Sequence, residues 1–205
     1  MEELSQPQRL IVAITGASGV IYGIRLLETL ARDRAIETHL ILTPAGRATI
    51  AQETAWNPRD VEALAAVVHP NSNIGASIAS GSFETRGMIV APCSVKTLSA
   101  IANSYSAELV ARAADVQLKE GRSVVLLVRE TPLHTGHLQL MQRAAQNGAV
   151  IMPPVPAFYG RPKMLDDVVN ATVGRALARI GIRNRLYFEW LGMANPALAE
   201  TAETE

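Results

Sequence analysis

The chain has 205 residues with 48% hydrophobic content, which suits one α/β domain with a real core and is short for two. Lys and Arg total 19, as do Asp and Glu, so the formal net charge is zero and gives no electrostatic reason to expect nucleic acid or an anionic membrane as partner. One cysteine excludes a disulfide within the chain, the N-terminus lacks the pattern of a signal peptide, and no apolar run reaches the ~20 residues that span a bilayer, so we expect a cytoplasmic protein.

Short apolar runs alternate with longer segments of helical periodicity along the chain. In chain order, we expect a strand at 9–15, a helix at 20–32, a strand at 37–43, helices at 44–53 and 60–68, an irregular stretch at 69–83, a strand at 87–91, helices at 94–102 and 107–120, a strand at 123–128, a helix at 134–147, a strand at 149–152 and a helix at 165–180. Asp60 is the expected N-cap of its helix. Gly148 and Gly181 follow helices at positions that favour a positive φ.

This alternation predicts an α/β fold, a three-layer α/β/α sandwich with a mostly parallel sheet of the flavodoxin-like or Rossmann-like kind. We expect one domain over residues 9–191, a flexible N-terminus at 1–8 and a flexible tail at 192–205. Ligands of such sheets bind beyond the carboxyl ends of the strands. The residues that directly follow each strand are therefore the candidates for a site.

The first strand is followed by Gly-Ala-Ser-Gly at 16–19. The glycines allow a tight turn into a helix N-terminus, whose free N–H groups favour a phosphate. The spacing is not G-x-G-x-x-G, and the second strand ends in Leu42-Thr43 rather than in an acidic residue, so a mononucleotide fits better than a dinucleotide. A tight turn without a ligand is the alternative.

The strand at 87–91 is followed by Pro-Cys-Ser-Val-Lys-Thr-Leu at 92–98. Ser94 is expected to cap the next helix with Thr97 one turn in, which predicts a second anion site at this edge of the sheet. An ordinary N-cap is the alternative. Cys93 is expected to be a small buried residue rather than a nucleophile, because no base accompanies it in the sequence.

Three pairs of polar residues are further candidates for a site. Arg129 and Glu130 leave the strand at 123–128 and point to opposite sides, so each can serve a different ligand group, unless they form an ordinary surface ion pair. Arg175 and Arg179 share one helix face, for which solvation is the simpler explanation, and we favour this explanation for Arg179. His134 and His137 form H-x-x-H without a third ligand, so we expect a helix cap at His134 and no metal.

Several segments, in this order, resemble the UbiX-type flavin prenyltransferases over residues 9 to about 190. They are TGASG at 15–19, ASGSF at 79–83, PCSVKTLSAIA at 92–102, ARAADVQLKEGR at 111–122, LVRETPLH at 127–134 and GAVIMPPVPAFY at 148–159. The resemblance implies a flavodoxin-like homo-oligomer, usually a dodecamer. It also implies transfer of a prenyl group from dimethylallyl monophosphate to reduced FMN without a metal, which gives prenylated FMN for a UbiD-type decarboxylase.

The resemblance assigns roles by position. It implies FMN contacts at Gly16, Ala17, Ser18, Thr43, Ser94, Val95, Lys96, Thr97 and Arg129. It implies donor-phosphate contacts at Lys119, Tyr159 and Arg175, with Arg129 nearby. Glu130 is then the first candidate for acid/base work and Glu53 the second, with Ser18 relaying the proton.

The sequence departs from these relatives in the loop before ASGSF, where some carry a tryptophan and this chain has Asn73-Ile74. The preferred length of the donor is therefore left open. Two other functions are also left open. One is a flavin-dependent decarboxylase of the peptidyl-cysteine type, although its Pro-x-Met-Asn segment is absent from the sequence. The other is a flavin-carrying accessory subunit of a decarboxylase, which would not need a second phosphate site.

Overall fold

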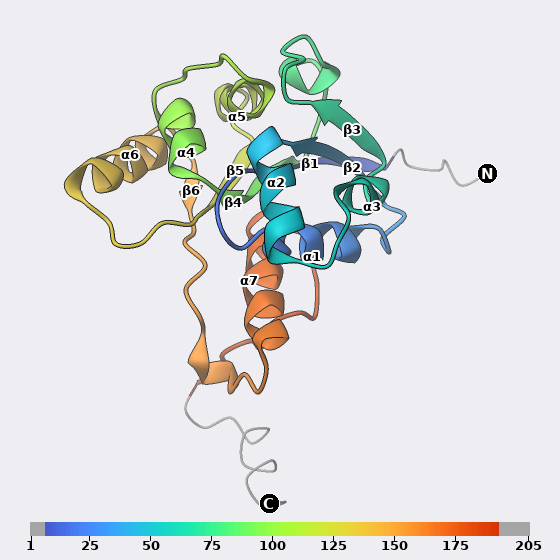
Figure 1. The fold of residues 1–205 in the computed structure, drawn as a ribbon, viewed down its shortest axis with the longest axis vertical. Coiled ribbons are helices and arrows are strands. Elements are labelled where there is room, and N and C mark those ends of the chain that lie inside the picture. The colour runs from blue at the N-terminus through green and yellow to red at the C-terminus, as the bar shows by residue number, and fades with distance from the viewer. Residues whose placement is uncertain (1–6, 193–205) are drawn as a thin grey trace, which may run out of the picture.

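The computed structural model describes residues 7–192, and within this range six strands form one sheet (Figure 1). They are β1 (Gln8–Ile14), β2 (Ile36–Leu42), β3 (Val67–Pro70), β4 (Gly87–Cys93), β5 (Ser123–Val128) and β6 (Val150–Ile151). The order is β3-β2-β1-β4-β5-β6, and every neighbouring pair is parallel. The order reverses between β1 and β4, which opens a crevice at the carboxyl ends of these two strands.

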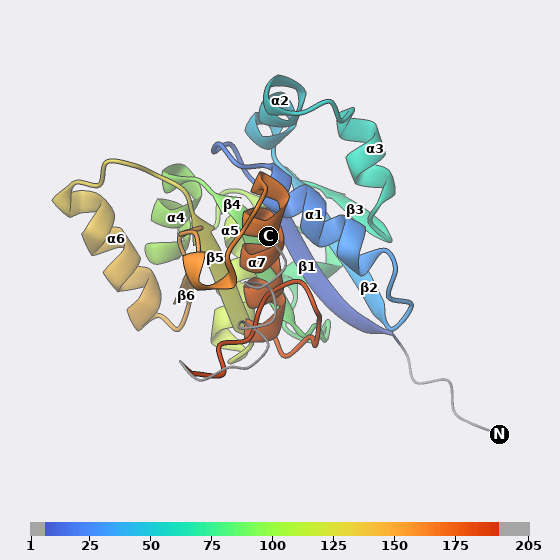
Figure 2. The ribbon, with the colours of Figure 1, turned by 90° about the horizontal axis from the view of Figure 1, so that it is seen from below.

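Helices cover both faces of the sheet, which confirms the predicted three-layer α/β/α class. They are α1 (Ile21–Leu30), α2 (Pro44–Glu53), α3 (Pro58–Ala63), α4 (Val95–Ala102), α5 (Leu109–Lys119), α6 (Thr135–Gln146) and α7 (Leu165–Arg179). Helix α1 packs against α7, while α4 packs against both α5 and α6. Both views show α4 and α6 side by side, away from α1 (Figure 1, Figure 2).

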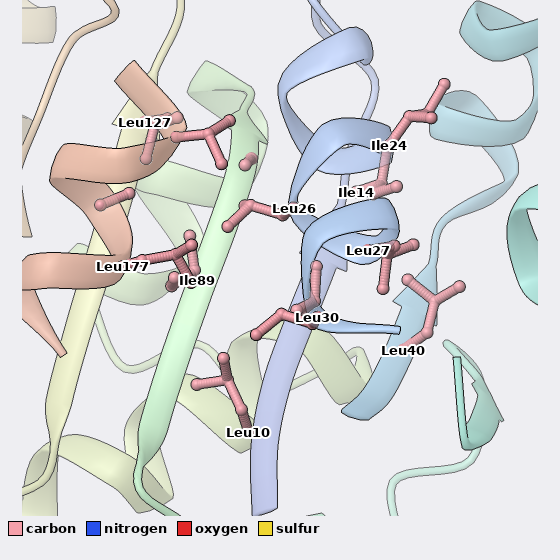
Figure 3. Close-up of a cluster of buried hydrophobic side chains, with 14 of the residues drawn as sticks. Leu10, Ile14, Ile24, Leu26, Leu27, Leu30, Leu40, Ile89, Leu127 and Leu177 are labelled. Atoms are coloured by element: carbon pink, nitrogen blue, oxygen red, sulfur yellow. The ribbon is translucent and has the colours of Figure 1, made fainter. Parts of the chain in front are cut away.

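The strands are apolar on both sides because each side faces a layer of helices. In β1, Leu10 and Ile14 pack with α1 and α7, while Ile11 and Ala13 pack with α4 and α5, and all four are fully buried. Figure 3 shows Leu10 and Ile14 beside the leucines of α1. Burial of a large apolar side chain stabilises the fold by roughly 1.5–3 kcal/mol, so this double-sided core holds the strand ends in fixed places.

The helix predicted over 60–68 is wrong in its N-cap and in its end. Helix α3 begins earlier, because Asn57 rather than Asp60 is the N-cap and its side chain accepts a hydrogen bond from the Arg59 N–H at 2.9 Å. Val67 and Val68 belong to β3, where they pair with β2. Two adjacent β-branched residues fit a pleated edge better than a helix.

The other predicted helices and strands agree with the structure to within two residues at each end. Gly148 and Gly181 have φ of 102° and 77°, as expected after helices. The predicted flexible tails fall mainly on residues 1–6 and 193–205, which lie outside the described residues, although β1 already begins at Gln8. Between residues 7 and 192, none of the helices combines the length and apolarity that crossing a bilayer requires.

Candidate functional site

Thr15 joins the ends of β1 and β4 where the strand order reverses. Its hydroxyl donates to the Pro92 carbonyl at 2.8 Å and accepts from the Ser94 N–H at 2.9 Å. The residue is 1% exposed, so these bonds form out of water. Thr15 therefore fixes the two loops that follow these strands at a constant separation.

The Gly-Ala-Ser-Gly loop runs close against α2. A Cβ at Gly16 would lie 2.3 Å from the Ala45 Cβ, which leaves no room for any side chain at that position. At the other end of the loop, Gly19 has φ of 94° and its N–H donates to a Glu53 carboxylate oxygen at 2.8 Å. The Glu53 side chain thus holds the loop by accepting a hydrogen bond from the loop backbone.

Two helices begin at this edge of the sheet with hydroxyl caps. Thr43 caps α2 by accepting from the Gly46 N–H at 3.0 Å, and Ser94 caps α4 by accepting from the Thr97 N–H at 3.3 Å. The cap at Ser94 confirms the prediction. Helix N-termini present free N–H groups and a partial positive charge, so both starts favour an anion.

A cavity of about 500 Å³ lies between these loops and helix starts. It is lined by Thr15, Gly16, Ala17, Ser18, Thr43, Pro44, Ala45, Ser94, Val95, Lys96, Thr97, Glu108, Arg129 and Glu130. All nine residues predicted to contact a flavin are in this set, and so is Glu130. The volume is within the range of ~300–1,000 Å³ that is usual for small-molecule sites.

Arg129 brings a cation to the cavity from the end of β5. Its backbone N–H donates to the Cys93 carbonyl at 3.1 Å, which ties β5 to β4 beyond the regular ladder. No carboxylate of residues 7–192 forms a salt bridge with the Arg129 guanidinium. Glu130 accepts from the Thr131 N–H at 2.9 Å. A cation without an acidic partner is suited to a ligand phosphate.

Tyr22 lies near Arg129 and was missed in the sequence. Burial raises the pKa of the Tyr22 phenol, while the Arg129 charge and a hydrogen bond with Thr172 of α7 oppose this increase. Tyr22 of α1 is therefore near both Arg129 and α7. Arg175 follows Thr172 by about one helical turn and does not line the cavity.

Glu108 was also missed, although it lines the cavity. Its carboxylate is 2.7 Å from the Lys96 Nζ and accepts from the Asn71 amide at 3.1 Å. The hydrogen bond from Lys96 lowers the pKa of Glu108, Asn71 and the Lys96 charge act in the same direction, and partial burial opposes them. The sequence feature that could have identified Glu108 is an acidic residue just before a helix that begins beyond the carboxyl ends of the strands.

A single chain does not bring Lys119 to the cavity. Helix α5 starts beside the cavity at Glu108 and ends at Lys119, so its 11 residues carry Lys119 roughly 16 Å away. Lys119 instead pairs with Glu120 and packs on Gly81. Its predicted contact with a donor phosphate stays a prediction for an assembly of chains.

Tyr159 and Arg175 also lie outside the cavity, and each contacts an aromatic residue of the segment that follows α7. The Tyr159 ring meets the Trp190 ring edge to face at 5.7 Å, and the Arg175 guanidinium lies 5.7 Å from the centre of the Tyr187 ring. Tyr159 is 38% exposed and Arg175 is exposed. Both therefore present polar groups to solvent in a single chain.

The remaining candidates have structural roles in the described chain. His134 caps α6 as expected, because its Nδ1 accepts from the Gly136 N–H at 3.0 Å, and its ring packs on His137 at 3.7 Å. Cys93 is fully buried, and burial raises the pKa of its thiol, so it is no nucleophile at neutral pH.

Comparison with known proteins gives consistent matches. The Flavoprotein family model matches residues 1–177. The Flavin prenyltransferase UbiX of Escherichia coli K12 is 57% identical over 187 residues, which is 90% of this chain and 99% of that protein.

Solved structures agree with these matches. The crystal structure of AnUbiX (PadA1) in complex with FMN and dimethylallyl pyrophosphate has a TM-score of 0.88 at 44% identity, covering 91% of this chain and 99% of that one. A dodecameric FMN-dependent Ubix-like decarboxylase from Escherichia coli O157:H7 has a TM-score of 0.88 at 45% identity, covering 90% and 100%. The peptidyl-cysteine decarboxylase EpiD, at 12% identity and a TM-score of 0.58, shares the fold alone.

Proposed function

The chain belongs to the flavin prenyltransferase family of flavoproteins, and from this we propose that it transfers a dimethylallyl group from dimethylallyl monophosphate to reduced FMN. The product would be prenylated FMN. The observation that carries the proposal is that four loops, which follow β1, β2, β4 and β5, place their predicted flavin-contacting residues around one cavity. A flavin-binding role for these residues is part of the proposal.

The cavity has the groups that a flavin mononucleotide requires. A phosphate fits best where the Gly16–Ser18 loop meets the N-terminus of α2, because the free N–H groups of a helix start point there beside Thr43. Gly16 makes this cradle possible, since any larger residue would collide with Ala45. When bound, reduced FMN supplies the nucleophilic positions that accept the prenyl group.

Release of the donor's phosphate leaves negative charge that must be stabilised. Arg129, Lys119, Tyr159 and Arg175 are the groups we propose for it, and each charge-assisted hydrogen bond is worth roughly 1.5–3 kcal/mol. Fixed donors of this kind take the place of a metal ion. In one chain only Arg129 faces the cavity, so the proposed donor site is completed by neighbouring copies of the chain.

A homo-oligomer, in our proposal a dodecamer, is supported by apolar surface near Tyr159. Val155 and Phe158 are each 73% exposed, and Leu165 is 76% exposed. These side chains lie on the proline-rich loop and at the start of α7, and together they offer an apolar surface to a second copy. The relative from Escherichia coli O157:H7 forms a dodecamer.

Glu130 is the proposed acid/base residue. It lines the cavity next to Arg129, and only one of its oxygens is used, by the Thr131 N–H. Glu53 is the second candidate, but its carboxylate already holds the Gly19 N–H, which favours positioning of the loop over proton transfer. Ser18 lines the cavity on the same loop and is proposed to pass the proton onward.

Purified protein, anaerobically reduced FMN and dimethylallyl monophosphate should give a flavin heavier by one prenyl unit, without added magnesium. The same reaction with dimethylallyl pyrophosphate separates the two donors. Mass spectrometry that finds only unmodified FMN with both donors would refute the proposal. Oxidative decarboxylation of a C-terminal cysteine would favour the peptidyl-cysteine type, and activity only within a stoichiometric complex would favour an accessory subunit.

We further propose a UbiD-type decarboxylase as the acceptor of the product and the cytoplasm as the place of the reaction. Prenylated FMN is of use only to an enzyme that binds it, so transfer to such a partner is required. When the product is incubated with a decarboxylase that is inactive because it lacks this cofactor, the activity of the decarboxylase should be restored. Fractionation of cells should find the protein with soluble enzymes, and recovery with membranes would contradict the second proposal.

A further inference from the structure

Glu108 faces the flavin cavity, yet none of the proposed chemistry requires it. It lines both the large cavity and a smaller cavity of about 70 Å³ between α4 and α5. Lys96 also lines both, and the two side chains are joined at 2.7 Å. The pair of Lys96 and Glu108 is therefore part of the wall that the two cavities share.

Asn71 holds the Glu108 carboxylate in place. Its backbone carbonyl accepts from the Leu109 N–H at 2.8 Å, its side-chain carbonyl accepts from the Val110 N–H at 3.1 Å, and its amide donates to Glu108 at 3.1 Å. Asn71 is 8% exposed and accepts hydrogen bonds from the first N–H groups of α5, whose N-cap residue Glu108 makes no capping hydrogen bond with its side chain. Both oxygens of Glu108 are thus engaged, one by Lys96 and one by Asn71.

The charges around the large cavity cancel. Among its lining residues, Lys96 and Arg129 are positive and Glu108 and Glu130 are negative, so two charges of each sign give a formal sum of zero. Without Glu108, the sum would be +1. A carboxylate at the wall of a phosphate-binding cavity opposes binding of an anion, and it also holds Lys96 toward α5.

We propose that Glu108 is a specificity-determining residue, which cancels the charge of Lys96 so that the cavity binds phosphate through its fixed N–H groups rather than through net charge. This inference rests on the proposed function, because it takes FMN as the occupant. Fixed N–H groups at one loop fit a single phosphate monoester. A net positive cavity would also attract flavins that carry a diphosphate.

The test compares Glu108→Gln with wild-type protein by titration of FMN and of riboflavin, which lacks the phosphate. Glutamine keeps one acceptor oxygen, which can face Asn71, and removes the charge together with the acceptor that faces Lys96. At low salt, we expect Glu108→Gln to bind FMN roughly three- to tenfold more tightly, and at high salt this gain should shrink. Riboflavin affinity should stay within about twofold, since no phosphate is present to respond. A purely structural role would change both flavins alike.

Three further variants separate an effect of charge from an effect on folding. Lys96→Gln should weaken FMN binding, and the double variant with Glu108→Gln should return close to wild type. Asp115→Asn is the matched control, because Asp115 is ion-paired on the same helix but lines neither cavity. The inference is overturned if Glu108→Gln leaves FMN affinity unchanged or lowers it, or if both flavins gain equally. If wild-type protein binds no FMN, the proposed function fails as well.

Discussion

Replacing Gly16 by alanine tests whether the close contact between the Gly-Ala-Ser-Gly loop and α2 shapes the cavity. The new Cβ would lie 2.3 Å from the Ala45 Cβ, while the next nearest atoms are at 3.4 Å. Gly16 does not have a positive φ, so the collision is the main cost of the methyl group. Neither Cβ can rotate away, so the loop or the helix must move by about 1 Å to reach an ordinary contact.

The magnitude follows from the cost of overpacking, which is about 1–3 kcal/mol. Ala45→Gly alone removes a good helix former from the first turn of α2 and should cost at most about 1 kcal/mol. The double variant removes the collision and should therefore be more stable than the sum of the two single effects. We expect a favourable coupling of about 1–2 kcal/mol.

Urea unfolding without flavin gives the stabilities, and FMN titration gives the affinities. Gly16→Ala should weaken FMN binding about tenfold or more, because each 1.4 kcal/mol of loop distortion is a factor of ten. Gly75→Ala is the control, since its Cβ would meet only the Asn73 side chain at 3.7 Å. If the double variant shows no recovery in either measurement, the contact with Ala45 does not set the loop.

Glu130→Gln should not weaken FMN binding, because the amide still accepts the backbone bond and the loss of a negative charge from the cavity favours a phosphate. It should slow prenylation by about 10²-fold or more, as followed by mass spectrometry, and an unchanged rate removes Glu130 from acid/base work. Thr15→Val should lower the free energy of unfolding in urea by about 1–3 kcal/mol, because the Ser94 N–H loses its acceptor, and a loss below about 0.5 kcal/mol would contradict this. Burial, and next the His39 charge, lower the pKa of His69 below 6.5. Its stabilising contribution is thus complete above this pH and is lost as the pH falls through the lowered pKa. As the pH is lowered from about 7 to 5, the free energy of unfolding should therefore fall less for His69→Gln than for wild type. An equal fall in both proteins would show that His69 does not cause the loss of stability.

The place of the cavity that we propose for FMN could be predicted from the sequence, because its residues are local to strand ends. Parallel strands place all their carboxyl ends at one edge, so a residue that follows a strand is already located once the strand is recognised. Ser94 and Arg129 are examples, since each comes directly after a buried strand. The hydrophobic pattern therefore predicts convergence without knowledge of the strand order.

Contacts between distant segments could not be predicted in this way. Glu108 is held by Asn71, which is 37 residues earlier and follows an edge strand of four residues. That strand was itself interpreted as the end of a helix, because Val67 and Val68 are too few to establish a period of two. Only pairing with β2 determines their structure, and pairing is a property of the fold rather than of the segment.

Helix α5 shows why a single chain contains the cavity proposed for FMN but not the whole of the proposed donor-phosphate site. Its first turn belongs to the flavin cavity through Glu108, while Lys119 at its last turn is roughly 16 Å away. A rigid helix cannot bring both ends to one place. Tyr159 and Arg175 are likewise on the surface of the chain, beside exposed apolar residues. The flavin cavity is therefore a property of the fold, whereas the donor-phosphate site, if these residues form it, is a property of the assembly.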